Sequence, residues 1–587
     1  MTPNLRVSSG NAELAVYVWG EARPNRPTVV LVHGYPDSAV VWEPVARQLA
    51  ERFYVVAYDV RGAGQSNRPR SMRSYQLEVL VRDLGDVIRE VSPDRPVHLV
   101  GHDWGSIQGW EAVTTERLQA RIASFTSISG PCLDHAALWL RRRLSSVSRQ
   151  DFSQALNQLA HSWYIGFLHL PLAAPLAWKL GFDKLWPGVI RKPRAASAEA
   201  ASTQAEDGAV GVKLYRANVL PRLLKPQPRS TTLPVQLVVP RRDAFMVGEL
   251  WNDLLQWAPQ LWRRDIGAGH WVTLSHPERL AGWIAEFVDA HEGEGESAAL
   301  RHARVRPRVE GKPDANKRVI VTGAGSGFGR ETALLFAERG AEVIGVDIDV
   351  AALQRTVDLA ALLGASMQMQ VVDVGDAKQM KGLADRIERE FGAPDIVVNN
   401  AGVGMAGAFL DTKLDDWERV LQVNLWSVIY ASRLFGKQML AAGRGGHIVN
   451  VASMGAFAPS RFLSAYNTSK AAVRMLSDCL RAELVDHGIG VSTICPGFSI
   501  TNITRSTRFA GADEDRQAQL QQAATKLYQK RNLQPQAIAL AIVQAVEQDL
   551  AEVPVGIEAH ASRWISRVVP GLARRVARID PRLRGDD

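Results

Sequence analysis

The sequence predicts an α/β protein built from two enzyme-sized units, and three observations support this. Short apolar runs bounded by turn residues alternate with helical segments, a pattern typical of parallel sheets covered by helices. The chain has 587 residues, whereas a single hydrophobic core stops growing at roughly 250 to 300 residues. A polar stretch also separates the apolar runs into two series. We therefore expect two α/β units in succession.

The first series predicts a unit over residues 1–291. Its apolar runs lie at 28–34, 54–60, 96–103, 123–130, 235–243 and 262–270. Between the fourth and fifth runs, about 131–230, a segment rich in Trp, Leu, Ala and Arg has helical spacing, and we interpret it as a helical lid. Residues 292–315 have no apolar period and are expected to form a linker.

The second series predicts a Rossmann-type, doubly wound parallel sheet over residues 316–587. Its apolar runs lie at 317–325, 342–348, 367–374, 395–402, 446–453, 490–497 and 554–560. Helical segments separate these runs, so the expected connections are right-handed crossovers between parallel strands.

Composition favours a globular protein of the cytoplasm. Hydrophobic residues make up 46% of the chain and charged residues 22%, which is ordinary for soluble proteins. The three cysteines are widely spaced, so neither a disulfide framework nor a CxxC metal site is expected. The sequence has neither an export signal at its start nor a run of ~18 apolar residues. The net charge of +8 is concentrated in two arginine-rich segments without a nucleic-acid-binding motif, so we expect no nucleic-acid partner.

An aspartate occupies the position of a nucleophile in the first unit. Gly101-His102-Asp103-Trp104-Gly105 follows an apolar run and precedes a helical stretch, which is the context of a nucleophile elbow. A carboxylate that attacks an acyl carbon gives only a mixed anhydride. Asp103 therefore suits displacement at the sp³ carbon of an epoxide or an alkyl halide, with an alkyl ester as intermediate.

Hydrolysis of such an ester needs a base that activates water and a group that orients this base. His270 and Asp243 are the candidates, because each follows one of the last two predicted strands of the first unit. The backbone N–H groups of Tyr35, in the loop after the first predicted strand, and of Trp104 are the candidate oxyanion donors.

On these motifs, residues 10–290 resemble the epoxide hydrolase family of the α/β-hydrolase superfamily. HGYPD, YDVRGAGQS, GHDWGS and GAGHW are close to its signatures. The resemblance implies an α/β-hydrolase fold with a helical lid. It also implies that Tyr164 and Tyr215 hydrogen-bond the epoxide oxygen and donate a proton while Asp103 opens the ring to give a vicinal diol. Two alternatives remain: a haloalkane dehalogenase, which often has a second halide donor such as Asn where this chain has Tyr35, and a noncatalytic binding domain.

A glycine-rich loop opens the second unit. It follows an apolar run and begins a helix, so that its backbone N–H groups can approach a pyrophosphate. Asp347 ends the next predicted strand, where its carboxylate can bind both ribose hydroxyls and repel a 2′-phosphate. We therefore expect NAD as the cofactor in preference to NADP, with Arg330 as the residue that could weaken the preference. The loop residues expected to bind the cofactor are Gly323, Ser326, Gly327, Phe328 and Gly329.

A tyrosine and a lysine four residues apart predict the catalytic groups of the second unit. If their segment is helical, Tyr466 and Lys470 lie on one face of it. A nearby cation stabilises phenolate, so we expect the pKa of Tyr466 to fall toward neutrality, which suits an acid/base acting on a carbinol or carbonyl. Ser453, upstream, ends an apolar run and can hydrogen-bond the same oxygen.

Together with Asn399-Asn400-Ala401-Gly402, these motifs make residues 316–560 similar to the short-chain dehydrogenase/reductase family. The resemblance implies a catalytic tetrad of Asn424, Ser453, Tyr466 and Lys470, with Lys470 also binding the nicotinamide ribose. It implies no metal. The further cofactor contacts that it implies come from Asp373, Val374, Asn400, Pro496 and Gly497.

The whole chain resembles bifunctional bacterial proteins of the EphD type, which implies apolar, lipid-derived substrates. Ring opening gives a diol and this kind of dehydrogenase oxidises secondary alcohols, so a hydroxyketone is the expected product. The alternatives are that the two units act on unrelated substrates, or that the first only presents substrate to the second. We also expect a homo-oligomer formed through the dehydrogenase unit.

The C-terminal tail carries a further expectation, peripheral membrane contact. Six apolar residues can share one helix face flanked by arginines, as in helices that lie on anionic bilayers: Trp564, Ile565, Val568, Val569, Leu572 and Val576. Pro570 and Gly571 interrupt this helix. The alternatives are a solvated helix face and a cover over the substrate pocket.

Overall fold

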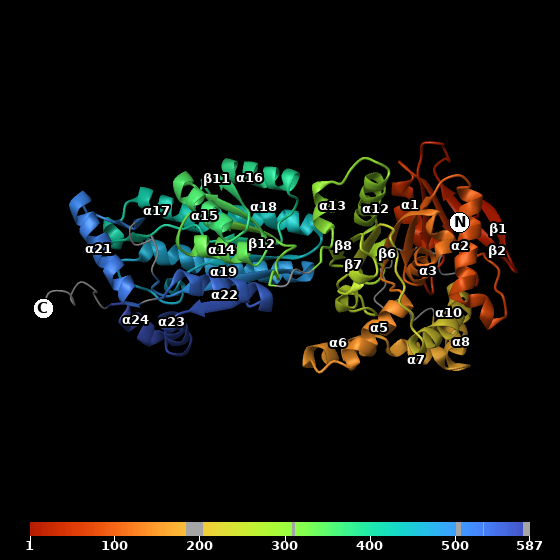
Figure 1. Ribbon diagram of the computed structural model, residues 1–587. Helices are drawn as coiled ribbons and strands as arrows, with labels where there is room; N and C mark the ends of the chain where they lie inside the picture. Colours follow the sequence, from red (N-terminus) through yellow and green to blue (C-terminus); the bar gives the residue numbers. More distant parts are fainter. Residues whose placement is uncertain (183–202, 308–310, 500–505, 532, 579–587) are drawn as a thin grey trace. The chain divides into compact units, whose positions relative to one another are not determined.

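The computed structural model describes residues 1–182, 203–307, 311–499, 506–531 and 533–578. The chain divides into two compact units, Met1–Arg306 and Pro307–Asp587, and each contains one large sheet (Figure 1). Part of the range expected to be a linker is folded onto the first unit as helix α13 (Ala298–Ala303). Leu300 in this helix is fully buried against Trp262 and Phe287. A helix of six residues is too short to show an apolar period in the sequence.

The sheet of the first unit is mixed. Its strand order is β1-β2-β4-β3-β5-β6-β7-β8, in which β2 pairs antiparallel with β1 and β4 and the other pairs are parallel. The strands are β1 (Leu5–Ser9), β2 (Ala12–Trp19), β3 (Thr28–Val32), β4 (Tyr54–Tyr58), β5 (Val97–His102), β6 (Ile122–Ile128), β7 (Val235–Pro240) and β8 (Leu261–Ile266). β3 to β8 correspond to the predicted runs, whereas β1 and β2 were not predicted. β1 is an edge strand with alternating burial, so it has no continuous apolar run.

Helices pack around this sheet in pairs. Helix α1 (Glu43–Leu49) packs against α12 (Pro277–His291), and α2 (Leu77–Val91) packs against α3 (Trp104–Val113). Between β6 and β7 the described residues are helical, and these helices lie together in Figure 1. They are α5 (Leu133–Leu144), α6 (Arg149–His161), α7 (Trp163–His169), α8 (Ala173–Ala177), a π-helical turn (Trp178–Phe182) and α10 (Gln204–Leu224). Residues 183–202, also within the range predicted as lid, lie outside the described residues.

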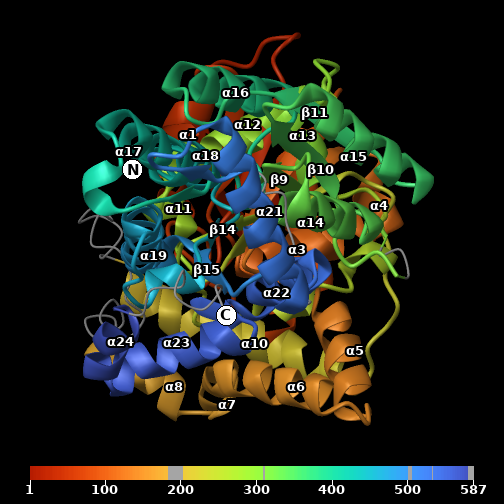
Figure 2. The ribbon, with the colours of Figure 1, turned by 90° about the vertical axis from the view of Figure 1, so that its left-hand side faces the viewer.

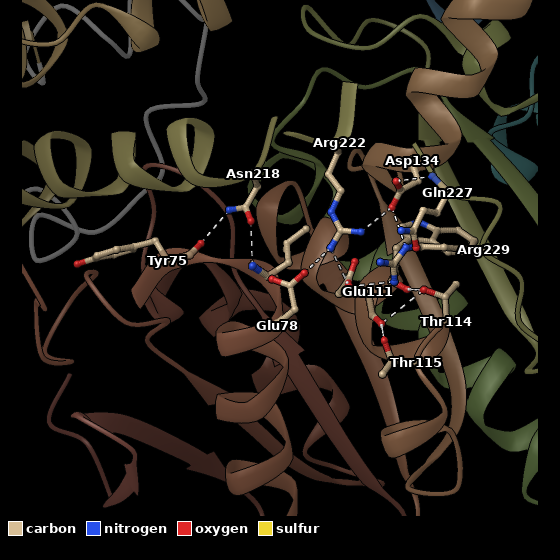
Figure 3. Close-up of polar contacts among 12 residues, drawn as sticks. Tyr75, Glu78, Glu111, Thr114, Thr115, Asp134, Asn218, Arg222, Gln227 and Arg229 are labelled. Atoms are coloured by element: carbon tan, nitrogen blue, oxygen red, sulfur yellow. Dashed lines mark hydrogen bonds and ion pairs between the residues drawn. The ribbon is translucent and has the colours of Figure 1, made fainter. Parts of the chain in front are cut away.

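A polar network fixes the end of α10 on the core of the first unit (Figure 3). Its centre is Arg222, which forms ion pairs of 2.7 to 3.0 Å with Glu78, Glu111 and Asp134. One turn earlier, Asn218 donates from Nδ2 to the Tyr75 carbonyl oxygen at 2.8 Å. Glu111 and Asp134 are buried, and a buried carboxylate that loses its cation is strongly destabilising. The network therefore holds α10 against α2, α3 and α5.

The sheet of the second unit is entirely parallel in its seven-stranded part, with the order β11-β10-β9-β12-β14-β15-β17. The strands are β9 (Arg318–Thr322), β10 (Glu342–Asp347), β11 (Met367–Val371), β12 (Ile396–Asn399), β14 (Gly446–Val451), β15 (Ile489–Pro496) and β17 (Glu552–Val555). A short pair, β13 (Met405–Ala406) and β16 (Arg508–Phe509), lies outside it. From β9 the chain adds strands first on one side of the sheet, up to β11, and then on the other side, starting with β12. In such folds, ligands bind beyond the carboxyl ends of the strands at the point where this order changes.

Helices cover both faces of this sheet (Figures 1 and 2). Val319 and Val321 of β9 belong to one core cluster with Phe336, whereas Ile320 belongs to another with Leu383. Consecutive residues of a strand point to opposite faces, so a strand covered on both sides is apolar throughout. The helices are α14 (Gly327–Glu338), α15 (Val350–Leu362), α16 (Ala377–Glu390), α17 (Leu414–Leu421), α18 (Ser427–Ala442), α19 (Ser464–Leu484), α21 (Glu514–Arg531) and α22 (Pro535–Gln548).

The last predicted run, 554–560, is only partly a strand. β17 ends at Val555, and Gly556, with φ of 94°, turns the chain into helix α23 (Ile557–Val568). The apolar residues after Gly556 belong to this helix, and their spacing in a run of seven residues does not distinguish the two structures.

Candidate active sites

Asp103 lies at a sharp turn between β5 and α3. Its φ of 52° and ψ of −120° are unusual for a residue with a side chain, and such strain is common at functional sites. The neighbouring glycines are required by close packing. A Cβ at Gly105 would lie 2.1 Å from the Val32 carbonyl oxygen, and a Cβ at Gly34 would lie 2.4 Å from Asp103 Oδ1. The structure thus has the strand, turn and helix that the sequence predicts for a nucleophile elbow.

We expect Gly105→Ala to destabilise the first unit by about 3 kcal/mol, because the added methyl group meets backbone atoms that cannot rotate away. Gly282→Ala is the matched control: Gly282 lies inside α12 with open space around it, so alanine should stabilise by roughly 0.5–1 kcal/mol through helix propensity. Urea unfolding measures both changes. Equal stability of the two variants would contradict the packing argument.

Asp103, Asp243 and His270 come together in space, as predicted. His270 Nδ1 lies 2.9 Å from Asp243 Oδ2, and its Nε2 lies 3.5 Å from Asp103 Oδ2. All three side chains are buried. Asp243 follows β7 and His270 follows β8, so the carboxyl edge of the sheet positions both. The imidazole therefore bridges the nucleophile and the orienting acid.

The two carboxylates control the charge of this histidine. Burial by itself lowers the pKa of His270, but the charges of Asp243 and Asp103 and their hydrogen bonds outweigh burial and raise the pKa to about 10. Burial raises the pKa of Asp243, and the charge and hydrogen bond of His270 outweigh this and lower it. The resting site thus holds an imidazolium between two carboxylates.

This pKa predicts a pH dependence of stability. A histidine whose pKa is raised on folding from 6.5 to about 10 contributes stability that is fully present below pH 6.5 and is lost as the pH rises toward 10. We expect the urea midpoint of the first unit to fall over this range in the wild type and to fall less in His270→Gln. Tryptophan fluorescence follows this unit, because most of the 16 tryptophans lie in it. Parallel pH profiles of the two proteins would contradict the assignment.

The candidate oxyanion donors also lie at the nucleophile. The Tyr35 N–H donates to Asp103 Oδ1 at 2.8 Å. Trp104 is the first residue of α3, so its N–H is among those that the helix itself leaves without an acceptor. The backbone N–H groups of Tyr35 and Trp104 thus both lie next to Asp103.

The rings of Tyr164 and Tyr215 pack edge to face near the nucleophile. Tyr164 comes from α7 and Tyr215 from α10, and their ring centroids are 5.9 Å apart. Tyr215 also packs on Trp104, at 4.9 Å between centroids. Both phenols are buried, and burial together with nearby charge, including that of Asp103, raises their pKa values well above the ordinary value of 10. Both therefore stay protonated near neutral pH and are able to donate hydrogen bonds.

Two further residues support this site and were not singled out from the sequence. His102 Nε2 lies 2.9 Å from the His270 carbonyl oxygen, and burial lowers the pKa of His102 to about 4. Phe245 donates its N–H to Asp243 Oδ1 at 2.9 Å, and its ring packs on His270 and Tyr164. Each lies next to a residue that was predicted, at one or two positions along the chain, and this proximity was the only signal available.

The glycine loop of the second unit is shaped for close approach of a ligand. Gly323 and Gly327 have φ of 68° and 54°, and a Cβ at Gly329 would lie 2.0 Å from the Gly323 carbonyl oxygen. Helix α14 begins at Gly327, directly after Ser326, and Phe328 follows in its first turn. The N-terminus of a helix favours an anion such as a pyrophosphate.

Asp347 ends β10 beside this loop. Its Oδ2 accepts the Gly325 N–H at 2.8 Å, and its Oδ1 accepts the Asp349 N–H at 3.0 Å. Arg330, the residue that could weaken a preference for NAD, donates to the Gly325 carbonyl oxygen and to Thr356 Oγ1. Asp347 and Arg330 thus both bond Gly325 of the loop, Asp347 at its N–H group and Arg330 at its carbonyl oxygen.

The other predicted cofactor residues lie at the carboxyl edge of the same sheet. Asn400 follows β12 and donates from Nδ2 to the Thr322 carbonyl oxygen at 3.0 Å. Asp373 and the buried Val374 follow β11, while Pro496 ends β15 and Gly497 follows it. Among the described residues, no group of three or more His, Cys, Asp or Glu side chains could hold a metal ion.

The predicted tetrad lies at the same edge. Tyr466 and Lys470 are on α19, Ser453 follows β14, and Asn424 lies in a π-helical turn (Gln422–Trp426). Asn424 is fixed by two hydrogen bonds with the Val403 backbone, at 2.8 and 3.0 Å. Lys470 Nζ donates to the Val451 carbonyl oxygen at 2.9 Å. Backbone groups therefore hold Asn424 and Lys470 at this edge.

The predicted fall in the pKa of Tyr466 is wrong for this structure. Burial raises the pKa of Tyr466, although a hydrogen bond with Ser453 lowers it in part. Lys470 Nζ lies 6.0 Å from the centroid of the Tyr466 ring, and burial lowers the pKa of Lys470 to about 8. The spacing of Tyr466 and Lys470 along the chain is visible in the sequence, whereas their surroundings in the fold and the distance between their side chains are not.

The two folds and their sites define an α/β-hydrolase unit followed by a short-chain dehydrogenase unit. Residues 27–277 match the model of the alpha/beta hydrolase fold, and residues 317–510 match that of short chain dehydrogenase. "Probable oxidoreductase EphD" of Mycobacterium tuberculosis is 42% identical over 578 residues, covering 96% of each chain. The chain therefore belongs to the EphD-like family of oxidoreductases, in which these two units are fused. The predicted fold class and the predicted EphD-type fusion are thus confirmed.

Other similar proteins match the second unit. The C alpha-dehydrogenase of a Sphingobium species is 32% identical over 262 residues, covering 43% of this chain and 86% of its own. A short chain dehydrogenase/reductase from Burkholderia phymatum, solved in complex with NAD, is 29% identical with a TM-score of 0.42, covering 46% of this chain and 98% of its own.

Proposed function

We propose that the first unit hydrolyses an epoxide to a vicinal diol through an ester of Asp103. The observation that carries this proposal is the pair of buried, protonated tyrosines, Tyr164 and Tyr215, near a buried carboxylate nucleophile. An epoxide oxygen needs a proton donor as its C–O bond breaks, and the carbon needs a nucleophile. This site supplies both.

In the first step, an Asp103 carboxylate oxygen forms a bond to an epoxide carbon while the ring C–O bond breaks. The electron pair of this bond goes to the epoxide oxygen, which takes a proton from one of the two phenols. The resulting phenolate later regains a proton from solvent, which balances the proton that the His270 imidazolium releases once Asp103 is esterified. The product of this step is a hydroxyalkyl ester of Asp103.

In the second step, water hydrolyses the ester. Esterification removes the charge of Asp103, one of the two carboxylates that raise the pKa of His270, so this pKa falls and the neutral imidazole becomes available as a base. His270 takes a proton from water, whose oxygen attacks the ester carbonyl. The N–H groups of Tyr35 and Trp104 stabilise the oxyanion. As it collapses, the ester C–O bond breaks and the leaving alkoxide takes the proton from His270 to become the diol. The carboxylic acid of Asp103 then gives its proton to His270, which restores the resting site.

A dehalogenase is the second candidate for this unit, since it uses the same nucleophile. Tyr35 argues against it. Its phenol donates to the Gly208 carbonyl oxygen at 3.0 Å, so its side chain gives no second halide donor of the asparagine kind at this position. The test is a screen of epoxides, haloalkanes and diols with the intact protein and NAD, in which diol, halide and NADH are measured separately. Diol from epoxides supports the proposal, and halide release without diol overturns it.

For the second unit we infer oxidation of a secondary alcohol, or reduction of the ketone, with a nicotinamide cofactor. The glycine loop and Asp347 fit the pyrophosphate and the adenosine ribose, because the backbone at Gly323 and Gly329 leaves no room for side chains. The bound cofactor supplies the hydride acceptor or donor. Tyr466 transfers the proton to or from the substrate oxygen, and Ser453 holds this oxygen. Lys470 and Asn424 fix the position of this pair.

We expect the wild type to prefer NAD over NADP. Asp347→Ala should lower the ratio of kcat/KM with NAD to kcat/KM with NADP about tenfold or more, because the carboxylate that repels a 2′-phosphate is lost. Asp358→Ala is the control, since it removes an exposed carboxylate of α15 whose hydrogen bond within the described part of the chain is with Gln354. The measurement is kcat/KM with each cofactor. A wild type that prefers NADP would show that Asp347 does not act in this way.

A further inference from the structure

The C-terminal helices of the second unit carry an exposed apolar stripe. It consists of Ile557, Ala561, Trp564 and Val568 of α23, Val569 between the two helices, and Leu572 and Val576 of α24 (Pro570–Val576). The first four are spaced i, i+4, i+7 and i+11, so they share one face of α23. Ile557 is 86% exposed, and Trp564 and Val568 are each 59% exposed. The two helices instead bury Ala559 and Ala573, so the stripe faces away from the core of this unit.

Basic residues flank the apolar stripe. Residues 557–578 contain five arginines and a single acidic residue, Glu558. Arg563 and Arg567 are bound to Glu552, which holds them beside α23, at 2.6 and 3.0 Å. Arg574 and Arg575 are exposed in the last turn of α24, and among the described residues neither has an acidic partner. The surface of α23 and α24 is therefore apolar along the stripe and positively charged beside it.

We propose that the apolar stripe docks this protein on an anionic bilayer surface. A helix with an apolar face, an aromatic residue and flanking arginines lies in the headgroup region, where the apolar face is buried and the arginines meet lipid phosphates. No described helix is both long and apolar enough to cross a bilayer, so the contact is peripheral. A second copy of the chain fits less well, because a two-fold contact of stripe on stripe would bring the unpaired arginines of both copies together.

The location of the stripe connects it with the dehydrogenase site. Helix α23 contacts the short helix η9 (Met454–Ala456), which directly follows Ser453. Arg461 donates to the Arg578 carbonyl oxygen at 3.3 Å, just beyond the end of α24. Both helices thus lie beside the segment between Ser453 and Tyr466 (Figure 2). If the proposed dehydrogenase function holds, binding of the apolar stripe to a bilayer would place this site close to apolar alcohols dissolved in the bilayer.

The test is co-sedimentation of the full chain with vesicles of phosphatidylcholine alone or with 30% phosphatidylglycerol. We expect binding to the anionic vesicles that weakens at high salt. The double variant Trp564→Glu/Val568→Glu should bind at least tenfold less. Arg574→Gln/Arg575→Gln should also bind at least tenfold less, because each arginine near an anionic surface contributes about fivefold. Leu362→Glu, at an apolar residue at the end of α15 that is even more exposed, should bind like the wild type.

Several results would overturn the proposal: no binding by the wild type, equal binding by the Trp564→Glu/Val568→Glu variant, or equal loss in Leu362→Glu. Dissociation of an oligomer by the stripe variant, with vesicle binding unchanged, would assign the surface to a second copy. Vesicle binding requires no turnover, so its outcome is independent of the proposed dehydrogenase function. The delivery step is tested separately, by oxidation of a vesicle-embedded alcohol and of a short water-soluble one. The Trp564→Glu/Val568→Glu variant should lose oxidation of the vesicle-embedded alcohol and keep oxidation of the water-soluble one.

Discussion

Asp103→Asn is expected to abolish epoxide opening, with a loss of about 10⁴-fold or more in kcat/KM, because an amide is a poor nucleophile at carbon. The asparagine has the size of the aspartate and retains an oxygen that can accept the Tyr35 N–H, so the elbow should fold as before. The measurement is diol formation from any epoxide that the wild type turns over. Retention of more than about 1% of the wild-type rate would show that another group opens the ring.

His270→Gln is expected to stop the reaction one step later, and a covalent ester should accumulate. Ring opening needs Asp103 and the tyrosines, whereas only ester hydrolysis needs the base. Intact-mass spectrometry of the variant with epoxide should show an adduct equal to the substrate mass. His161→Gln, at a half-buried histidine at the end of α6, is the control and should show none. Absence of the adduct on His270→Gln with every turned-over epoxide would exclude the ester mechanism.

Asp103, Tyr466 and Lys470 could be singled out from the sequence because each lies in a short motif whose local structure depends on neighbouring residues alone. An aspartate between two glycines at the end of a strand can only adopt the strained turn if the glycines make room, and the sequence shows all three together. The spacing of Tyr466 and Lys470 likewise follows from one helix. Such motifs need no knowledge of distant contacts.

Features that depend on contacts far apart in the sequence could not be predicted in this way. The bond between His102 and the His270 backbone joins residues 168 positions apart, and the ion pair of Arg222 with Glu78 joins residues 144 positions apart. The same limit explains the error on Tyr466. A nearby cation lowers a tyrosine pKa, but burial acts in the opposite direction and is decided by the whole unit.

Tyr466→Phe is expected to cause a large loss of dehydrogenase activity in the second unit. The phenylalanine ring keeps the packing of the half-buried tyrosine but has no proton to transfer, so dehydrogenase activity should fall about 10³-fold. Hydrolase activity should not change, because the hydrophobic core of the first unit contains no residue of the second. NADH and diol measured in the same samples report the two activities.

Tyr430→Phe is the matched control in the same unit. Its phenol accepts a hydrogen bond from Gln422 at 3.3 Å, and its ring stacks on Trp426, so it tests the loss of a hydroxyl without the loss of the proposed acid/base. Near-wild-type activity of this variant together with the loss in Tyr466→Phe would support the assignment. If both variants lose dehydrogenase activity equally, the effect is structural and Tyr466 is not the proton-transfer group. If Tyr466→Phe lowers diol formation as well, the two units do not act as separate catalysts, because removing one hydroxyl from one core should leave the other core intact.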